Sequence, residues 1–418
     1  MFFSFWPHKA EFSRTPKDLV TDLIAGLTVA IVALPLAIGF GITSGMSAAA
    51  GLTTAIIAGF LAALFGGSKY QVSGPTGAMT VILIPVVQKF GIAAIPALGI
   101  MAGTLVICMA IFKLGAVINR VPWTVVEGFT VAIALIISLQ QFPLALGIAK
   151  SQGDKSFNVA FNTVKNAINS GVNFVSLSIV ALTLLIKFSY PSIAKKFGIK
   201  HHIPASFVAL FLVTVVVNLF SINVATIGTI PRSIDSFHTI DFTNFSTLII
   251  PAIWIALLAA IESLLSARVA DGMAHEKLRF EPNRELFGQG LATVVSTVFG
   301  GMPATGAIAR SSVNVRSHAK SRLASIFHAV VLLVTALIAA PLVSKIPTAV
   351  IAGLLLGTSY RILNPTSIVE SLRTTKSEAI TLVITATSCV LIDLIWGIAI
   401  GIALHVSLSR YFNWPRAI

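Results

Sequence analysis

The sequence predicts an all-α polytopic membrane protein. Of its 418 residues, 56% are hydrophobic and only 11% are charged, whereas a soluble domain carries about 25% charged residues. Apolar runs of about 20 residues, the length of a membrane-spanning helix, recur from residue 18 to residue 412. Polar and apolar residues show little alternation within these runs, which disfavours an outer-membrane β-barrel.

Fourteen membrane segments are expected, and two of them are short. The third segment (75–89) and the tenth (304–317) each follow a Gly-rich extended stretch, so we expect two half-helices that are each preceded by a short strand. Pro143 is expected to disturb the end of the fifth segment. The other segments are expected at 18–42, 47–66, 93–112, 122–146, 172–189, 203–220, 246–268, 286–300, 323–343, 348–360, 378–392 and 395–411.

The two halves of the chain are predicted to form a 7+7 inverted repeat. Seven segments precede the break near Phe220 and seven follow it, and an odd number per half reverses the orientation of the second half. Segment three then corresponds to segment ten. The sequence supports this correspondence, because Gly-Pro-Thr-Gly-Ala at 74–78 is echoed by Pro-Ala-Thr-Gly-Ala at 303–307.

These paired half-helix starts predict an anion site. A helix that begins in mid-membrane leaves its first N–H groups unpaired and its positive dipole end exposed. Two such ends at one cavity can bind an anion without a cationic side chain. The expected lining is the backbone N–H groups of Gly77, Ala78, Gly306 and Ala307, the hydroxyls of Thr76 and Thr305, Ala304, and Phe40 as a wall.

Three further residues are candidates for electrostatic roles. Glu262 is an acid within an apolar span, and such residues are costly unless they have a function. Ser266 lies one helical turn later on the same face, so the pair could hold a proton or a sodium ion. Arg310 is expected either to snorkel to the membrane surface or to add positive potential beneath the anion cavity.

The charge distribution predicts the orientation in the membrane and argues against other classes of protein. The net charge of +14 arises from Lys and Arg, and all but six of these 29 residues fall in predicted cytoplasmic regions. This asymmetry predicts that the terminal segments 1–17 and 412–418 lie in the cytoplasm. It also explains the positive charge without a nucleic-acid partner, so none is expected. Two cysteines, Cys108 and Cys389, imply no disulfide framework. No catalytic, metal-binding or cofactor motif is apparent, so no enzyme is expected.

Several longer motifs accompany the two half-helix starts. They are Val-Ala-Leu-Pro at 32–35, Glu-Ser-Leu-Leu-Ser-Ala-Arg-Val-Ala-Asp-Gly-Met at 262–273 and Asn-Arg-Glu-Leu-Phe-Gly-Gln-Gly at 283–290. Together these motifs resemble those of the sulfate permease (SulP) family of anion transporters, and the likeness covers nearly the whole chain. The resemblance implies a core domain (18–112 and 246–343), a gate domain (122–220 and 348–411), elevator-like movement between them, and a homodimer. Members of the family commonly carry a cytoplasmic STAS domain after the last helix; this sequence stops at Ile418, so that domain is expected to be absent or to have been removed.

The resemblance predicts secondary active transport of a small inorganic anion, sulfate or bicarbonate, across a bacterial cytoplasmic membrane. Apolar Leu36 after the Pro of segment one is more similar to the bicarbonate carriers of the family. Sodium-coupled members carry Asp where this chain has Glu262, so proton coupling is favoured and a sodium-coupled bicarbonate symporter is the alternative. A nucleobase permease shares the architecture, but it would be expected to carry a carboxylate near the tenth half-helix.

Overall fold

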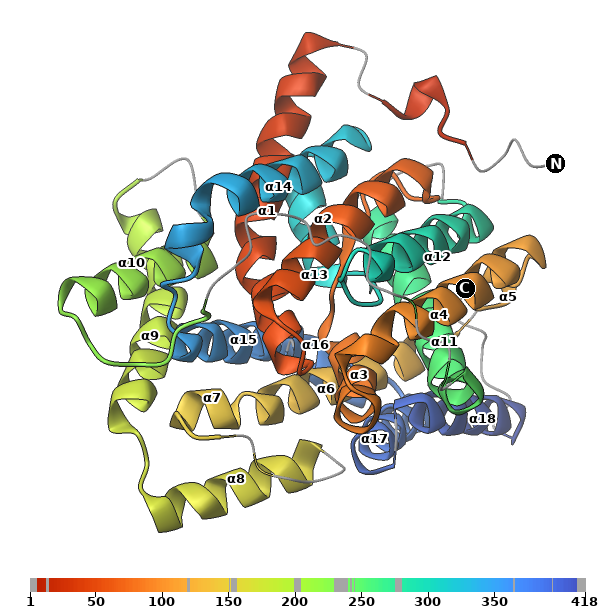
Figure 1. Ribbon diagram of the computed structural model, residues 1–418. Helices are drawn as coiled ribbons and strands as arrows, with labels where there is room; N and C mark the ends of the chain where they lie inside the picture. Colours follow the sequence, from red (N-terminus) through yellow and green to blue (C-terminus); the bar gives the residue numbers. More distant parts are fainter. Residues whose placement is uncertain are drawn as a thin grey trace.

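The computed structural model describes an almost entirely helical chain (Figure 1). The described residues are 6–12, 15–118, 121–149, 151, 156–198, 204–228, 240, 243, 245–274, 280–363, 365–392 and 394–411. The predicted terminal segment 412–418, and residues 1–5 and 13–14 of the segment 1–17, lie outside them.

Nearly every predicted membrane segment corresponds to a helix. Before residue 230 the elements are η2 (Lys9–Glu11), α1 (Pro16–Thr43), α2 (Ala48–Phe65), β1 (Ser73–Gly74), α3 (Gly77–Phe90), η3 (Ile92–Ala94), α4 (Ile95–Ile111), α5 (Gly115–Ile118), α6 (Trp123–Gln140), α7 (Phe142–Leu146), α8 (Ser156–Ser170), α9 (Phe174–Lys196) and α10 (Ala205–Leu219). After it come α11 (Phe245–Ala274), α12 (Pro282–Val298), β2 (Thr305–Gly306), α13 (Ile308–Arg316), α14 (Leu323–Val343), α15 (Thr348–Leu363), α16 (Pro365–Thr374), α17 (Lys376–Leu391) and α18 (Leu394–Tyr411).

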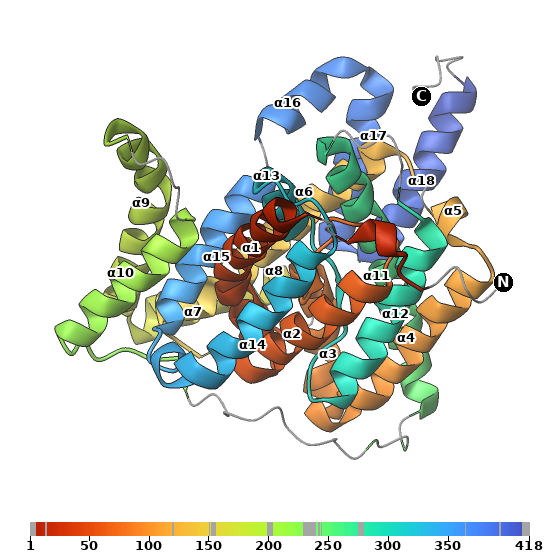
Figure 2. The same ribbon diagram turned by 90° about the horizontal axis from the view of Figure 1, so that it is seen from above.

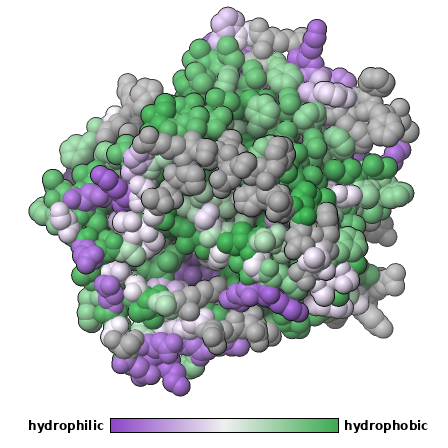
Figure 3. Space-filling model, viewed as in Figure 1, coloured by the Kyte–Doolittle hydropathy of each residue, from purple (hydrophilic) through white to green (hydrophobic). Residues whose placement is uncertain are grey.

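The helices are long and apolar enough for a multi-pass membrane protein. Among the described residues, seven helices can span a bilayer by length and composition, and the apolar segments at Gly77–Phe90, Ala205–Leu219 and Trp396–Leu408 are shorter. Many large apolar side chains are exposed, including Phe211 and Leu342. Apolar residues cover most of the surface seen in Figure 3, as expected where lipid replaces water.

The helices pack into two groups. In the first group, α1, α2, α4, α11, α12 and α14 contact one another and surround α3 and α13. In the second group, α6, α7, α9, α10, α15, α17 and α18 pack together, with α9 and α10 at the end of the molecule farthest from α4 and α12 (Figures 1 and 2). Contacts between the two groups include α1 with α15 and α10, α3 with α6, and the ring of Trp254 on α11 with that of Trp396 on α18.

Small residues allow the closest packing in the first group. An added Cβ at Gly103 on α4 would lie 2.6 Å from the carbonyl oxygen of Gly290 on α12, and an added Cβ at Gly290 would lie 2.6 Å from the carbonyl oxygen of Gly103. The two backbones are therefore in direct contact. Such close contact provides dispersion attraction where lipid gives helices little hydrophobic reason to associate.

Two breaks in the helical pattern agree with the sequence, and one boundary does not. The fifth segment breaks at Gln141, and Pro143 occupies the first turn of α7, as predicted. Strand β1 precedes α3 and pairs antiparallel with β2, with Ser73 opposite Gly306 and Gly74 opposite Thr305. The prediction of a strand within 300–303 and a helix from 304 was wrong, because β2 takes Thr305 and Gly306 and α13 begins only at Ile308.

Candidate functional site

The starts of α3 and α13 are joined through the β1–β2 pair. Thr76 caps α3, and its hydroxyl accepts a hydrogen bond from the Met79 N–H at 3.5 Å. Within the described part of the chain, the N–H groups of Gly77 and Ala78 have no hydrogen-bond acceptor. They are two of the orphan donors that a helix start leaves for a ligand.

The second start uses different N–H groups from those expected. The Gly306 N–H donates to the Ser263 hydroxyl at 3.0 Å, and the Ala307 N–H donates to the carbonyl oxygen of Val72 at 3.0 Å. The prediction that these two groups are free to bind an anion was therefore wrong. The free donors lie two residues later, because the N–H groups of Ile308 and Ala309 have no acceptor among the described residues.

Glu262 reaches the start of α3 from α11. The Thr76 hydroxyl donates to its carboxylate at 3.1 Å, and the Glu262 side chain is buried. Thr305 and Arg310, from the second start, lie close enough to act electrostatically on this carboxylate. One acid therefore contacts the first half-helix start and lies near the second, as the sequence predicted.

Ser266 does not complete a site with Glu262. Its hydroxyl lies 3.1 Å from the hydroxyl of Ser311 on α13, and the Ser311 hydroxyl accepts the N–H of Val72 at 3.0 Å. Sequence reasoning missed Ser263, whose hydroxyl lies 3.2 Å from that of Thr305. Ser263 could have been identified from the sequence, because it is a polar residue in the same apolar span, next to Glu262 and three residues before Ser266.

Arg310 turns into the protein instead of snorkelling to the surface. Arg310 is 1% exposed, and its Nη2 donates to the carbonyl oxygen of Pro75 at the start of α3. Its Nη1 has no acceptor among the described residues, and an added Cβ at Gly74 would overlap it. The guanidinium therefore places a positive charge directly behind the two helix starts.

Neighbouring side chains cover both glycines of the echoed motif. An added Cβ at Gly77 would lie 2.1 Å from Cδ1 of Ile137 on α6 and 3.3 Å from Cε1 of Phe40. At Gly306, an added Cβ would lie 2.2 Å from Nε2 of Gln71. Phe40 was predicted as a wall of the cavity, whereas Ile137 and Gln71 were not identified because they contact the glycines only in the folded chain.

Ala304 faces away from this arrangement. Its N–H donates to the Thr293 hydroxyl of α12 at 3.4 Å, and its carbonyl oxygen accepts from the same hydroxyl at 3.2 Å. The remaining predicted site residues, Thr76, Ala78, Thr305 and Ala307, are all buried. In the described part of the chain, no group of three His, Cys, Asp or Glu side chains could hold a metal ion.

A cavity of about 410 Å³ lies between the two helix groups, farther along α3. Its polar lining includes Thr43, Gln140 and Ser156, and the rest is mainly apolar. The Thr80 hydroxyl lies 3.2 Å from Oε1 of Gln140, so a polar contact between the groups borders this space. Ile136 and Leu139, on the same helix as Ile137, belong to the apolar lining.

Curated proteins with related sequences are transporters. The chain is 36% identical over 391 residues to the putative sulfate transporter YvdB of Bacillus subtilis, an alignment that covers 92% of this chain and 72% of that protein. It is 33% identical to the bicarbonate transporter BicA of Picosynechococcus, over 92% of this chain and 69% of BicA.

Solved structures share the fold. The transmembrane domain of a cyanobacterial BicA matches with a TM-score of 0.81 and 30% identity, covering 94% of this chain and 98% of that domain. SLC26A9 matches with a TM-score of 0.85 over 96% of this chain and 67% of that chain, at 16% identity, which supports the fold alone. The pattern of the sulfate permease family matches residues 19–385, and the chain therefore belongs to that family of transporters.

Proposed function

We propose that the protein is a secondary active transporter of a small inorganic anion, sulfate or bicarbonate, with the anion bound between the starts of α3 and α13. The observation that carries the proposal is the pair of half-helix starts, each with two N–H groups that have no acceptor in the described structure. Gly77 and Ala78 are buried, and a buried N–H group is costly without an acceptor. A small oxyanion would supply acceptors to both starts, and Arg310 would add positive potential behind them.

The transport cycle that we propose is an elevator-like movement within a 7+7 inverted repeat. The first helix group would be the core domain, which carries the anion, and the second group would be the gate domain. Contacts between the groups are fewer than those within the first group, which supports a sliding boundary. A homodimer in a bacterial cytoplasmic membrane, with both termini in the cytoplasm, completes the proposal.

Proton coupling through Glu262 is favoured over sodium coupling. Sodium would need several oxygen ligands around the Glu262 carboxylate, yet the hydroxyl of Ser266 is paired with that of Ser311 instead. A carboxyl that takes up a proton needs fewer partners, and Glu262 has hydroxyl neighbours at both helix starts. Protonation would also remove a negative charge beside the bound anion.

Uptake by proteoliposomes tests the function and the coupling ion. Labelled sulfate and bicarbonate are offered with an inward proton gradient without sodium, and separately with a sodium gradient at equal pH. We expect accumulation of one anion under the proton gradient. Accumulation that requires sodium and ignores the pH gradient would reject proton coupling, and no uptake of either anion under both gradients would reject the function.

Glu262→Gln separates binding from coupling in the same assay. The amide keeps the volume and the contact with Thr76 but cannot carry a proton. We expect this variant to lose accumulation against a gradient while anion exchange continues. Full accumulation by the variant would remove Glu262 from the mechanism.

A further inference from the structure

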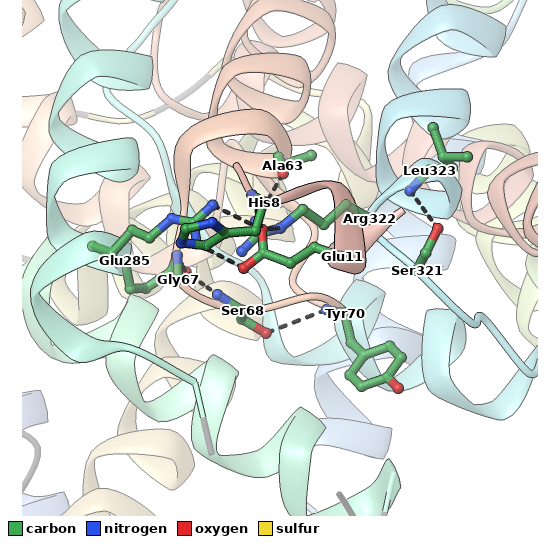
Figure 4. A network of polar contacts seen from close by, with 11 residues as sticks. His8, Glu11, Ala63, Gly67, Ser68, Tyr70, Glu285, Ser321, Arg322 and Leu323 are labelled. Carbon is green, nitrogen blue, oxygen red and sulfur yellow. Dashed lines mark hydrogen bonds and ion pairs between the residues drawn. The ribbon is translucent and has the colours of Figure 1, made fainter. Parts of the chain in front are cut away.

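A second cluster of charges lies where the N-terminal segment meets the first helix group, outside the proposed transport site (Figure 4). Glu11 of η2 is in contact with two arginines of the folded body. Nη1 and Nη2 of Arg284, at the start of α12, donate to its two carboxylate oxygens at 2.7 and 2.9 Å. Nε of Arg322, just before α14, donates to the same carboxylate at 2.7 Å.

Arg284 and Arg322 belong to the first helix group, whereas the Glu11 carboxylate belongs to the N-terminal segment that precedes α1. The side chains of Arg284 and Arg322 are 2% and 0% exposed, whereas that of Glu11 is 16% exposed. Arg322 is also fixed by the carbonyl oxygen of Ala63 at the end of α2, which its Nη1 contacts at 3.0 Å. The first helix group therefore contains a pair of buried guanidinium groups, and both of them bind the Glu11 carboxylate of the N-terminal segment.

Within the described part of the N-terminal segment, Trp6 and the Glu11 backbone make further contacts. Trp6 is 62% exposed and packs edge-on against Phe65, with ring centroids 5.6 Å apart. The backbone N–H of Arg322 donates to the Glu11 carbonyl oxygen at 3.3 Å. Burial raises the pKa of the Glu11 carboxyl. The hydrogen bonds from Arg284 and Arg322 and the positive charges of these two residues outweigh burial and lower the pKa to about 2. Glu11 is therefore an anion at neutral pH.

The guanidinium groups have more donors than this carboxylate accepts. Among the described residues, Nε of Arg284 and Nη2 of Arg322 are buried without an acceptor. Glu285 is the other nearby acid, but its carboxylate is occupied by the N–H groups of Gly67 and Ser68 at 2.8 and 2.9 Å and by Nε2 of Gln71 at 2.6 Å. Buried donors without partners mark a place where a ligand with further acceptor oxygens can bind.

We propose that Arg284 and Arg322 form a second anion site, which Glu11 fills as an internal ligand, and that a free oxyanion of carboxylate, bicarbonate or sulfate shape binds there when the Glu11 carboxylate is removed. The bidentate geometry at Arg284 is the one that guanidinium groups adopt with planar oxyanions. The inference does not depend on the transport function, because it concerns groups away from the half-helix starts.

The site is also connected to the transport site by contacts. Glu285 follows Arg284 in α12, and its carboxylate holds Gln71, whose amide covers Gly306 of β2. The charges of Arg284 and Arg322 act on this carboxylate, so an anion at the arginine pair would change the electric field at the group that holds Gln71 over the second half-helix start.

Chemical rescue tests the proposal. The melting temperature of the full chain in uncharged detergent is measured for the wild type, Glu11→Ala and Glu11→Gln, with rising formate, bicarbonate or sulfate and with chloride at equal ionic strength. We expect Glu11→Ala to melt at a lower temperature, and formate to restore it with a saturable dependence that chloride lacks. Glu11→Gln should show no such dependence, because its amide still fills the space beside Arg284.

Further variants and lipids complete the experiment. Asp18→Ala removes another acid of the N-terminal region, which bonds Thr15 and not an arginine, and should show no rescue. If Glu11→Ala is not recovered folded, Glu11→Ser is titrated in its place. Rescue by nanodiscs with anionic lipid, but not by soluble anions, identifies the oxyanion as a headgroup and supports the site. Equal responses of Glu11→Ala and Glu11→Gln to every anion and lipid would overturn it.

Discussion

Gly77 leaves no room for a side chain between α3 and α6. An added Cβ would overlap Cδ1 of Ile137 while staying 3.3 Å from Phe40, so the contact depends on the absence of a side chain at this one position. Arg310 and Glu262 both contact the start of α3, through the Pro75 carbonyl oxygen and the Thr76 hydroxyl. Single residues therefore decide both how closely the two helix groups approach and which ionisable groups lie beside the proposed anion.

We expect Gly77→Ala to reduce uptake strongly while the protein stays folded, since the new methyl group must push Ile137 away from α3. Overpacking of this kind costs about 1–3 kcal/mol. Ile137→Ala in the same chain should restore part of the uptake, because it removes the overlapping atoms. Gly272→Ala, with open space around it, is the matched control. Wild-type uptake by Gly77→Ala would show that the contact is unimportant.

The ion pair of Glu11 predicts a defined pH dependence of stability. Its pKa is about 2 in the folded chain against 4.5 as the ordinary value, so its contribution is present above about pH 4.5 and is lost as the pH falls toward 2. We expect Glu11→Gln to cost about 1–2 kcal/mol at pH 7, below the 3–5 kcal/mol of a fully buried pair, because solvent screens the partly exposed carboxylate.

The measurement is the melting temperature of the wild type and of Glu11→Gln from neutral to acid pH. The difference between the two proteins should be constant above about pH 4.5 and shrink below it. A difference that is unchanged at the lowest pH would contradict the assignment of the Glu11 charge to the two arginines.

Among the elements, the β1–β2 pair is only two residues long in each strand, yet it sets how the two half-helices lie relative to each other. It joins the starts of α3 and α13 and is supported by α11, whose Ser263 hydroxyl accepts the Gly306 N–H. Behind it, α12 packs against α4 and α2 through small residues. Sheet pairing therefore sets the relative position of the half-helices, and close helix packing keeps the pair in place.

We expect Gly290→Val to destabilise the protein more than a surface substitution, because its Cβ would lie 2.6 Å from the Gly103 carbonyl oxygen and the α12 backbone would have to move. The loss should exceed the roughly 1–3 kcal/mol of ordinary overpacking, since a backbone atom cannot rotate away. The melting temperature in detergent measures the loss, with Gly272→Val as control. Equal melting temperatures for the two variants would mean that α4 and α12 are not in close contact.

For the whole molecule, the two helix groups are the units that the proposed elevator moves. The contact of Thr80 on α3 with Gln140 on α6, at 3.2 Å, lies on the boundary between them. A boundary contact of this kind can exist in only some states of a sliding mechanism.

A disulfide across this boundary should therefore stop transport. We expect Thr80→Cys/Gln140→Cys, in a chain with Cys108→Ser and Cys389→Ser, to lose uptake on oxidation and to regain it on reduction. Each single cysteine variant, oxidised in the same way, should keep its activity. Undiminished uptake by a fully cross-linked double variant would exclude relative movement of the two groups at this point.

Local sequence patterns were enough to predict the membrane class, nearly all helix positions and the two interrupted segments, because hydrophobicity and Pro/Gly breaks are local properties of the chain. They also singled out Glu262, which contacts the start of α3, since an acid in an apolar span is visible without a fold. They did not identify α8 and α16, which are amphipathic and too polar to resemble membrane spans.

Which groups meet depends on long-range contacts in the folded chain. The later start of α13 follows from pairing with β1 and from the Ser263 hydrogen bond to Gly306, both between residues far apart in the chain. The inward turn of Arg310 and the arginine pair around Glu11 have the same origin. A buried charge or N–H group takes whichever partner the fold brings within hydrogen-bonding distance, and that partner cannot be read from the residues beside it.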